Sequence, residues 1–349
     1  MTKHAHEMKS TLFSLLTLAT VLFFAVSCDN DLDVNAPFEE TTIVYTTLDA
    51  STSVNYIRVT RAYLGDEGIY GGNNVADSLY YDSLDVQLVG RNQSGNIVQQ
   101  ITAIKDASIT LDTGFFTTQG YTAYRINGNL NEDLIYEVVV TRPEDNAVIR
   151  AETQMVQDFE ITQPRFPTVN PAGIRGQEVA WDQAVNGRVY NANMHLRYVE
   201  FPRNNKADSS RHTVTYSFPY VTGDNEEGIG EISSFITLDQ FYGNVAAKLT
   251  PPAGNRIRIA RRVDVEVVAG ADDLATYINV SQPQSGVLQD PPLFTNVENG
   301  VGIVSSIRRS FELNKRLANA SLDELVYGDY TCGLRFGKVT TSDTLFCQP

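Results

Sequence analysis

Alternation of apolar and polar residues is the feature that most constrains how this chain folds. It runs through segments such as 54–59, 84–89 and 213–218, which are bounded by Gly, Asn, Asp or Pro. Because successive side chains of a strand point to opposite faces of a sheet, this alternation predicts half-buried antiparallel strands. The 17 tyrosines and 16 phenylalanines also favour sheets over helices. We therefore expect a mainly β protein.

The first half of the chain ends on a local pattern that is typical of β-sandwiches. Leu130 lies six residues before Tyr136, which opens a strand. This spacing resembles the tyrosine corner of immunoglobulin and fibronectin type III domains, in which the Tyr hydroxyl bonds backbone near the preceding turn. A turn at Pro143 and a closing strand over 147–153 complete a hairpin. The sequence predicts an Ig-like β-sandwich over residues 38–160.

A cluster of prolines follows this region. Pro164, Pro167 and Pro171 each fix φ and remove a backbone donor, which favours an extended linker over residues 161–176. The remaining residues, 177–349, are then expected to form a second β-rich domain.

Helical signals occur only in this second domain. Its first strand contains Trp181, the only tryptophan, which we expect in the core. Asp272 and Ser321 stand at positions that favour N-caps. Short helices are predicted over residues 233–245, 272–280 and 322–326.

The first thirty residues differ in composition from the rest. Lysines precede an apolar run over 12–26 that ends in Ser27 and Cys28, which predicts an export signal over residues 1–27. The run is shorter than the ~20 residues that a membrane span needs. Residues 25–28 resemble a bacterial lipobox, so Cys28 is the expected lipid-attachment site. An ordinary signal with a coincidental cysteine is the alternative.

An acidic tether over residues 28–37 follows, with Asp29, Asp31 and Asp33. It resembles the surface-export signal of lipoproteins in the Bacteroidota, and a plain solvated tether is the alternative. The net charge of −15 argues against nucleic acid, whose phosphates require a basic surface. We expect an outer-membrane lipoprotein exposed at the cell surface, with the periplasmic face as the alternative.

Two further cysteines, Cys332 and Cys347, remain in the exported chain. In an oxidising compartment they favour a disulfide that closes a short loop, and two free thiols are the alternative.

Motifs for catalysis, metal binding or cofactor binding are not found. The chain has no Cys-x-x-Cys, His-Glu-x-x-His, phosphate loop or Gly-x-Ser-x-Gly sequence. Of four histidines, only His195 and His212 follow the signal, and both lie in alternating strands. We predict no catalytic residue, no metal ligand set and no cofactor. A scattered triad that includes His195 or His212 is the alternative.

Two features are candidate contact surfaces. A glycine-rich loop carries Tyr70 and precedes Tyr80 and Tyr81, an arrangement suited to binding a sugar, a peptide or a partner. Inward packing of Tyr80 or Tyr81 is the alternative. The second is a basic strand that is suited to an acidic partner or is simply solvated, with Arg256, Arg258, Arg261 and Arg262.

Three Asp-Ser/Thr-apolar sequences match the O-glycosylation sequon of exported Bacteroidota proteins. They place candidate glycosylation sites at Ser78, Ser83 and Thr344. We expect at least one of them, Ser78 or Ser83 first, to be modified in such a host.

A motif late in the chain provides a family resemblance. Its fixed positions are Asn296, Glu298, Asn299, Gly300 and Gly302. It resembles the signature of an uncharacterised lipoprotein family called domain of unknown function 4249. The resemblance implies a cell-surface lipoprotein that accompanies a TonB-dependent outer-membrane transporter. Because Asn and Gly tolerate positive φ, the motif itself predicts a turn with a structural role.

Together these features predict a non-catalytic binding or accessory lipoprotein beside such a transporter, and they do not identify a small-molecule or glycan ligand. A structural or adhesive surface protein is the alternative, and a hydrolase is the third class. The hydrolase would require His195 or His212 to lie in a pocket against a carboxylate.

Overall fold

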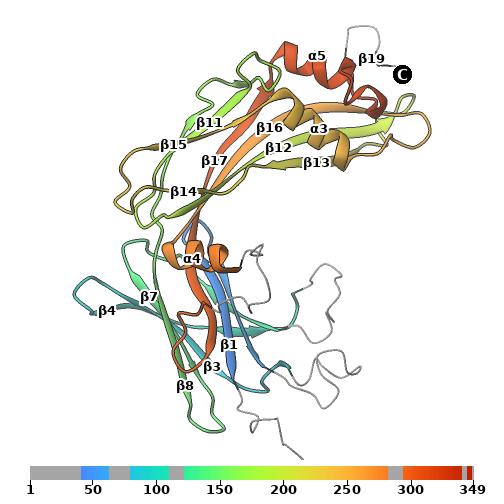
Figure 1. Cartoon of the computed structure of the whole chain (residues 1–349). Helices are drawn as coiled ribbons and strands as arrows, with labels where there is room; N and C mark the ends of the chain where they lie inside the picture. Colours follow the sequence, from blue (N-terminus) through green and yellow to red (C-terminus); the bar gives the residue numbers. More distant parts are fainter. Residues whose placement is uncertain (1–40, 63–78, 110–121, 282–293, 340–343, 348–349) are drawn as a thin grey trace, which may run out of the picture. The chain divides into compact units, whose positions relative to one another are not determined.

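The computed structural model describes residues 41–62, 79–109, 122–281, 294–339 and 344–347 (Figure 1). Residues 40–349 group into one unit by their contacts. The described chain is mainly β, with several sheets and a few short helices, as predicted. The export signal, Cys28, the acidic tether, Tyr70 and Ser78 lie outside the described residues.

Two sheets enclose the first hydrophobic core. One face of it comes from β1 (Thr42–Asp49), β2 (Val54–Arg61), β6 (Ala123–Asn127) and β5 (Ile104–Asp106). The other comes from the antiparallel sheet of β4 (Ile97–Thr102), β3 (Asp85–Arg91), β7 (Ile135–Thr141) and β8 (Val148–Gln154). Inward residues such as Leu48 and Ile57 from one sheet pack in the same cluster as Leu88 and Val138 from the other. This arrangement is a sandwich.

The hydrogen bond expected from Tyr136 is present. Tyr136 is fully buried near the start of β7, and its hydroxyl accepts the Asn131 N–H at 2.9 Å. The same hydroxyl bonds Gln99 on β4. β7 and β8 pair as the predicted hairpin. One side chain therefore holds the turn before β7 against the edge strand of its sheet.

The second core lies against long strands of the second half. Its sheet is built on β12 (Val189–Pro202), β13 (Ser210–Ser217), β16 (Arg256–Gly270) and β17 (Val301–Leu317). A smaller sheet joins β9 (Ile161–Gln163), β11 (Gln177–Asp182) and β15 (Glu231–Ile236). Trp181 of β11 lies in the second core, as predicted. Short pieces complete the sheets: β10 (Thr168–Val169), β14 (Val221–Thr222), β18 (Gly337–Val339) and β19 (Thr344–Phe346).

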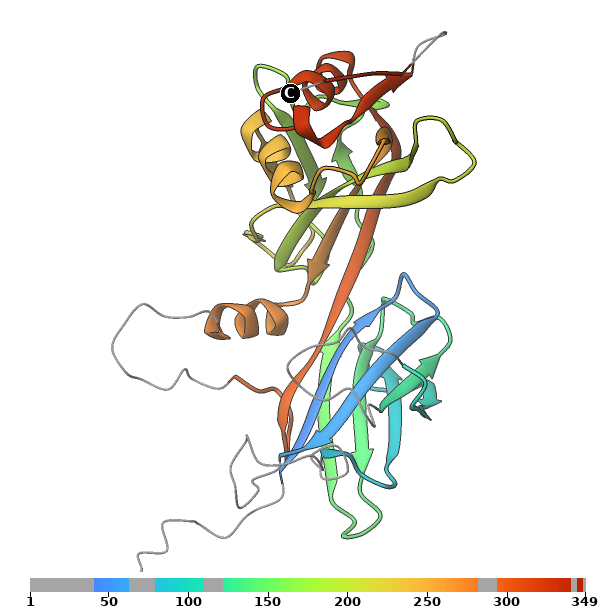
Figure 2. The ribbon, with the colours of Figure 1, turned by 90° about the vertical axis from the view of Figure 1, so that its right-hand side faces the viewer.

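Strand β17 belongs to both halves, as Figure 2 shows. Its first part pairs in parallel with β1, from Ile43↔Val301 to Asp49↔Ile307. Its second part pairs antiparallel with β16, from Gly270↔Ile307 to Val263↔Lys315. Val304 contributes to the first core. The predicted division assigned this strand wholly to residues 177–349, because alternation does not reveal which strands pair.

The proline-rich segment also takes part in the sheets. Residues predicted as an extended linker form β9, which pairs with β11, and β10, which pairs with β17. Parts of segment 161–176 are therefore strands in the sheets of the second half, and the segment is not only a linker.

The helices differ from their predictions mainly at their N-termini. Helix α4 (Asp272–Ser281) lies where it was expected, but Asp272 is its first residue and not its N-cap. Helix α3 (Leu238–Lys248) starts later than predicted, because Thr237 and Gln240 form a capping box and the preceding residues belong to β15. Ser321 is not an N-cap, since α5 (Asn319–Tyr327) begins after Ala318. Its hydroxyl donates to Asn170 Oδ1 at 2.7 Å and accepts the Ala172 N–H at 3.1 Å. Within the described ranges, no helix has the length and apolar character to cross a membrane.

The late motif fastens β17 to the first core. The Asn296 side chain pairs with both backbone groups of Val304, at 2.7 and 3.0 Å, and donates to Asp273 of α4 at 3.1 Å. Glu298 exchanges backbone hydrogen bonds with Arg150 of β8. These contacts give the motif the structural role predicted from its turn residues.

The glycines of the motif are required by close backbone approach. Asn299 has φ 58° and Gly302 has φ 123°. A Cβ on Gly302 would lie 2.0 Å from the Val44 carbonyl oxygen, and one on Gly300 would lie 2.7 Å from the Thr42 carbonyl oxygen. Larger residues at these positions would separate β17 from β1.

Gly302→Ala should therefore strongly destabilise the fold. The added methyl group meets backbone that cannot move without breaking the β1–β17 pairing, and the φ is strained for alanine, so we expect a loss of about 2–4 kcal/mol. Urea denaturation followed by circular dichroism would measure it. Gly95→Ala is the matched control, since Gly95 has φ 79° but open space around it. Equal losses in the two variants would contradict the importance of the close approach.

Candidate functional site

A gap opens in the second sheet where β16 and β17 separate. Their pairing ends at Val263↔Lys315, and the next residues of β17 pair with β10 instead. β16 continues beside β12, and on its other side it meets the chain again only at Arg258, which bridges to Phe336. The described residues thus leave one edge of β16 without a strand partner between Arg258 and Val263.

Polar contacts fix the point of separation. Asn314 of β17 has φ 63° and lies in the irregular stretch between the pair Val265↔Glu312 and the last pair, Val263↔Lys315. Its N–H donates to Asp264 Oδ1 at 2.7 Å, and its side-chain oxygen accepts from Arg197 at 2.7 Å. Arg197 and Asp264 also form an ion pair at 2.8 Å. The gap is therefore held by residues of three neighbouring strands.

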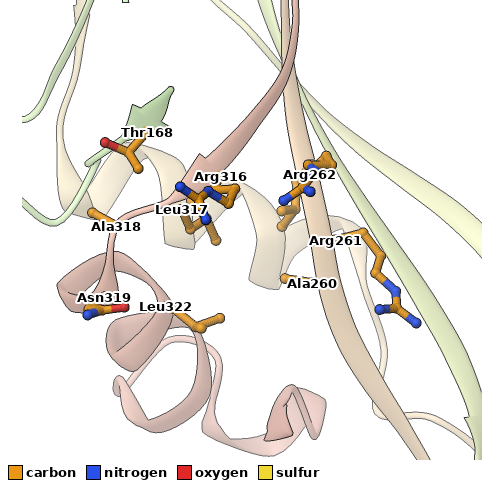
Figure 3. Close-up of a pocket in the computed structure, with 10 residues that line it drawn as sticks. Thr168, Ala260, Arg261, Arg262, Arg316, Leu317, Ala318, Asn319 and Leu322 are labelled. Carbon is orange, nitrogen blue, oxygen red and sulfur yellow. The ribbon is translucent and has the colours of Figure 1, made fainter. Parts of the chain in front are cut away.

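A pocket of about 520 Å³ lies in this gap. Arg261 and Arg262 of β16 and Arg316 of β17 provide its cationic lining. Consecutive strand residues normally point to opposite faces, but the β12–β16 register shifts between Arg197↔Arg262 and Tyr198↔Ala260. Arg261 is the additional residue of this bulge, so two consecutive arginines reach one pocket. Figure 3 shows Arg262 directed toward Arg316, whereas Arg261 extends away from it at the side of β16.

The remaining walls are apolar or weakly polar. Leu196, Leu317 and Leu322 supply apolar surface. Thr168 of β10 and Asn319, the first residue of α5, supply polar groups. The N-cap of α5 is Ala318, which has no side-chain cap, so no side chain of the cap covers the N–H groups of the first turn. These uncapped N–H groups and the helix dipole make this end of the pocket favourable for negative charge.

The predicted basic strand separates into two parts. Arg258 is only 5% exposed and pairs with Glu200 at 2.9 Å. Arg256 pairs with Glu200 at 3.0 Å and with Asp208 at 3.1 Å. These two charges are neutralised within the protein, so they are not a docking surface for an acidic partner.

By contrast, the pocket arginines have no acidic partner among the described residues. No ion pair or side-chain hydrogen bond is formed by Arg261, Arg262 or Arg316 within that part of the chain. Guanidinium groups close to one another repel, and an anion between them relieves that repulsion. The pocket is thus chemically suited to bind an anion.

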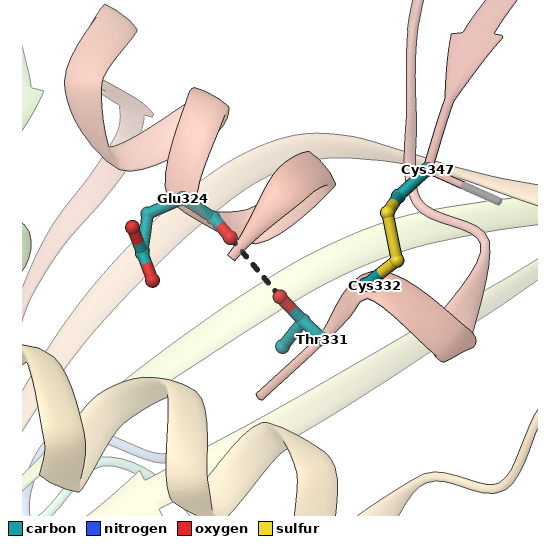
Figure 4. The surroundings of a disulfide bond; sticks show 4 residues. All are labelled: Glu324, Thr331, Cys332 and Cys347. Carbon is teal, nitrogen blue, oxygen red and sulfur yellow. Dashed lines mark hydrogen bonds between the residues drawn. A yellow bond between two sulfur atoms is a disulfide. The ribbon is translucent and has the colours of Figure 1, made fainter. Parts of the chain in front are cut away.

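The C-terminal segment supports the wall that α5 provides. Leu325 and Val326 of α5 and Phe336 after it are buried in the second core. The predicted disulfide is present between Cys332 of η2 (Cys332–Leu334) and Cys347, with Cα atoms 5.0 Å apart (Figure 4). Thr331 donates to the Glu324 carbonyl at 3.1 Å and links η2 to α5. The alternative of two free thiols is excluded by this pairing.

The histidines lie apart from one another and outside the pocket lining. His195 contacts Thr215 Oγ1 at 2.9 Å and Glu266 Oε2 at 3.2 Å. His212 stacks on Tyr198 with ring centroids 5.3 Å apart. His195 thus lies against a carboxylate, and it is not among the residues that line the pocket between β16 and β17. Among the described residues, no group of three or more His, Cys, Asp or Glu side chains is placed to hold a metal ion.

The tyrosines predicted as a contact surface do not all remain available. Tyr81 is buried in the first core, and its hydroxyl bonds Thr42 at 2.8 Å. Its backbone carbonyl accepts from Lys105 at 3.0 Å. Inward packing, the alternative for this position, therefore describes Tyr81, while Tyr80 is half-buried.

The glycosylation candidates differ in what the structure describes. Ser83 is exposed before β3 and is sterically open to modification. Thr344 lies at the start of β19, but its side chain is outside the described atoms. Ser78 lies outside the described residues.

Sequence reasoning found part of the pocket and missed the rest. Arg261 and Arg262 were singled out as basic residues, whereas Arg316, Thr168 and Asn319 were not. Nothing in the local sequence pattern brings these distant segments together. No protein-family model matches this chain, and no curated protein matches it significantly.

Cys347→Ser should destabilise the C-terminal segment. The disulfide closes a loop with a sequence separation of 15, and a loop of this size is worth about 3 kcal/mol in the chain-entropy description. We expect a lower urea midpoint for the variant. Wild-type protein treated with reductant should behave like the variant, and an unchanged midpoint in both would contradict the prediction.

Glu266→Gln should weaken the fold more at neutral than at acidic pH. The hydrogen bond with His195, helped by the charges of His195 and Arg309, holds the pKa of the Glu266 carboxyl below its ordinary value of 4.5. Because the folded-state pKa is lowered, ionised Glu266 stabilises the fold above pH 4.5, and this contribution is lost as the pH falls through the folded-state pKa. Denaturant midpoints measured between pH 7 and pH 3 should therefore converge for variant and wild type. Glu144→Gln, at an exposed position, is the control and should not change the midpoint.

Proposed function

We propose that this protein is a membrane-anchored surface lipoprotein that acts as a non-catalytic binding component, or accessory component, beside a TonB-dependent outer-membrane transporter. The observation that carries the binding role is the pocket between β16 and β17, with arginines that have no acidic partner among the described residues. Such cations favour a negatively charged ligand, since no described residue supplies the counter-charge.

The composition of the pocket favours binding over catalysis. The residues that line it in the described part of the chain include no His, Cys, Asp or Glu. Thr168 supplies the hydroxyl of this lining, and no general base lines the pocket beside it. Nucleophilic catalysis normally requires such a base next to the nucleophile.

The proposed anchor rests on the sequence. The apolar run, the lipobox-like residues 25–28 and the acidic tether support export and lipid attachment at Cys28. One acyl chain binds a membrane weakly, whereas a multiply acylated cysteine anchors firmly. The resemblance of the Asn296–Gly302 motif to domain of unknown function 4249 supports the transporter association.

A structural or adhesive role is the second candidate, and a specific strand favours it. β4 is an edge strand of its sheet and exposes Ile97 at 54% and Val98 at 58%. Exposed apolar edge strands can pair with another chain. Concentration-dependent polymers of wild-type protein that are lost in Val98→Lys would favour this role over ligand binding.

Cys28→Ala should release the protein from the membrane. Without the thiol, no acyl chain can be attached, so the variant should appear in soluble fractions while wild type fractionates with the outer membrane. Metabolic labelling with a radioactive fatty acid and fractionation of the host cells would measure both. Cys347→Ser is the control, since it removes a cysteine without removing the anchor. Fatty-acid labelling of Cys28→Ala would contradict the anchor.

The transporter association is tested by affinity purification of tagged wild type from solubilised outer membranes. We expect a TonB-dependent transporter to co-purify at a stoichiometric level. Isolation without one under several growth conditions would count against the accessory role but would leave ligand binding open.

A further inference from the structure

We infer that the pocket between β16 and β17 binds the phosphate group of a small phosphate monoester, with the organic part of the ligand against the leucine wall. This inference rests on the proposed binding function and deepens it by naming the class of ligand.

The charge of the lining favours a dianion. Arg262 and Arg316 approach the gap from its two strands, and Arg261 adds charge at the side (Figure 3). The surrounding chain is acidic, with a net charge of −15, yet these arginines have no carboxylate partner among the described residues. A phosphate monoester carries nearly two negative charges at neutral pH, and guanidinium groups bind its oxygens bidentately.

The neighbouring donors suit a tetrahedral oxyanion. The first turn of α5 has no side-chain cap, and its helix is nine residues long. Asn319 and Thr168 add an amide and a hydroxyl at the lining. A phosphate oxygen can accept several hydrogen bonds at once, which suits a lining that draws donors from several elements.

The size and the apolar wall define the rest of the ligand. A volume of about 520 Å³ is that of a small-molecule site rather than a polymer groove. Leu196, Leu317 and Leu322 offer surface for a ring or a short chain attached to the phosphate. Inorganic phosphate would leave this surface without a partner.

Isothermal titration calorimetry on the protein as purified from its host in detergent, whether or not it is lipidated, tests the inference, with phenyl phosphate as the probe. We expect saturable binding that weakens as salt is raised, because the attraction is electrostatic. Phenyl sulfate, which has the same shape but one fewer negative charge, should bind several-fold more weakly. Inorganic phosphate should also bind more weakly, because it lacks the ring.

Arginine variants identify the site. Arg262→Gln and Arg316→Gln should each weaken phenyl phosphate binding about tenfold or more, as expected for a lost charge-assisted contact. Arg261→Gln should have a smaller effect, because its side chain extends away from Arg316. Arg91→Gln is the matched control: it removes the same charge from a strand of the first core and should leave the affinity unchanged. Circular dichroism of each variant would verify folding.

Several outcomes would overturn the inference. One is the absence of phenyl phosphate binding at millimolar concentration. Another is an affinity for phenyl sulfate or for inorganic phosphate equal to that for phenyl phosphate. A third is that folded Arg262→Gln and Arg316→Gln variants bind phenyl phosphate like wild type. Vesicles that contain phosphatidic acid distinguish a lipid source of the phosphate. Binding to these vesicles without binding to phenyl phosphate would also overturn it.

These measurements are independent of the anchor and the transporter. Absence of fatty-acid labelling in the wild-type protein, or absence of transporter co-purification, would contradict the proposed function and leave phosphate binding standing. If the protein associates with the membrane but does not bind phenyl phosphate, phosphate binding is contradicted and the proposed anchor stands.

Discussion

Pairing of β17 with β1 is the contact on which both halves of the fold depend. The two strands run in parallel although some 260 residues separate them, and they approach so closely that a side chain at Gly302 would meet the Val44 carbonyl. Just before β17, the Asn296 side chain bonds the backbone of Val304 in that strand, and the Glu298 backbone bonds β8. Continuing along β17, the chain passes from the first core to the second without a break in the strand. Each core therefore depends on a strand that also serves the other.

The pocket is a consequence of where β17 stops pairing with β16. A strand that remained paired to its end would have filled the edge of β16 with backbone and placed Arg316 against the sheet. Instead, Asn314 adopts a positive φ and is held by Asp264 and Arg197. Beyond that point β17 pairs with β10, and residues at the start of α5 also line the pocket. The disulfide holds the C-terminal segment that follows α5. The pocket thus arises from the way several segments meet, and no single segment forms it.

Local signals in the sequence predicted what depends on neighbouring residues. Alternation located the strands, the spacing of Leu130 and Tyr136 located a hydrogen bond, and the late cysteines paired as expected. Long-range pairing was not predictable, because period-two alternation identifies a face but not a partner. The same limit hid the pocket: whether a basic strand residue is neutralised depends on Glu200 and on a bulge at Arg261, which lie outside any local pattern. Arg256 and Arg261 look alike in sequence and differ entirely in surroundings.

Net charge and local charge lead to different conclusions about partners. A chain at −15 repels an extended polyanion, which must approach a large area of the surface at once. A small anion in a pocket experiences mainly the charges within a Debye length, which is about 8 Å at physiological salt. Within such a distance the nearest guanidinium groups outweigh the more distant carboxylates. An acidic protein with an arginine-lined pocket can therefore exclude nucleic acid and still select a small phosphate ester, with size as well as charge deciding what enters.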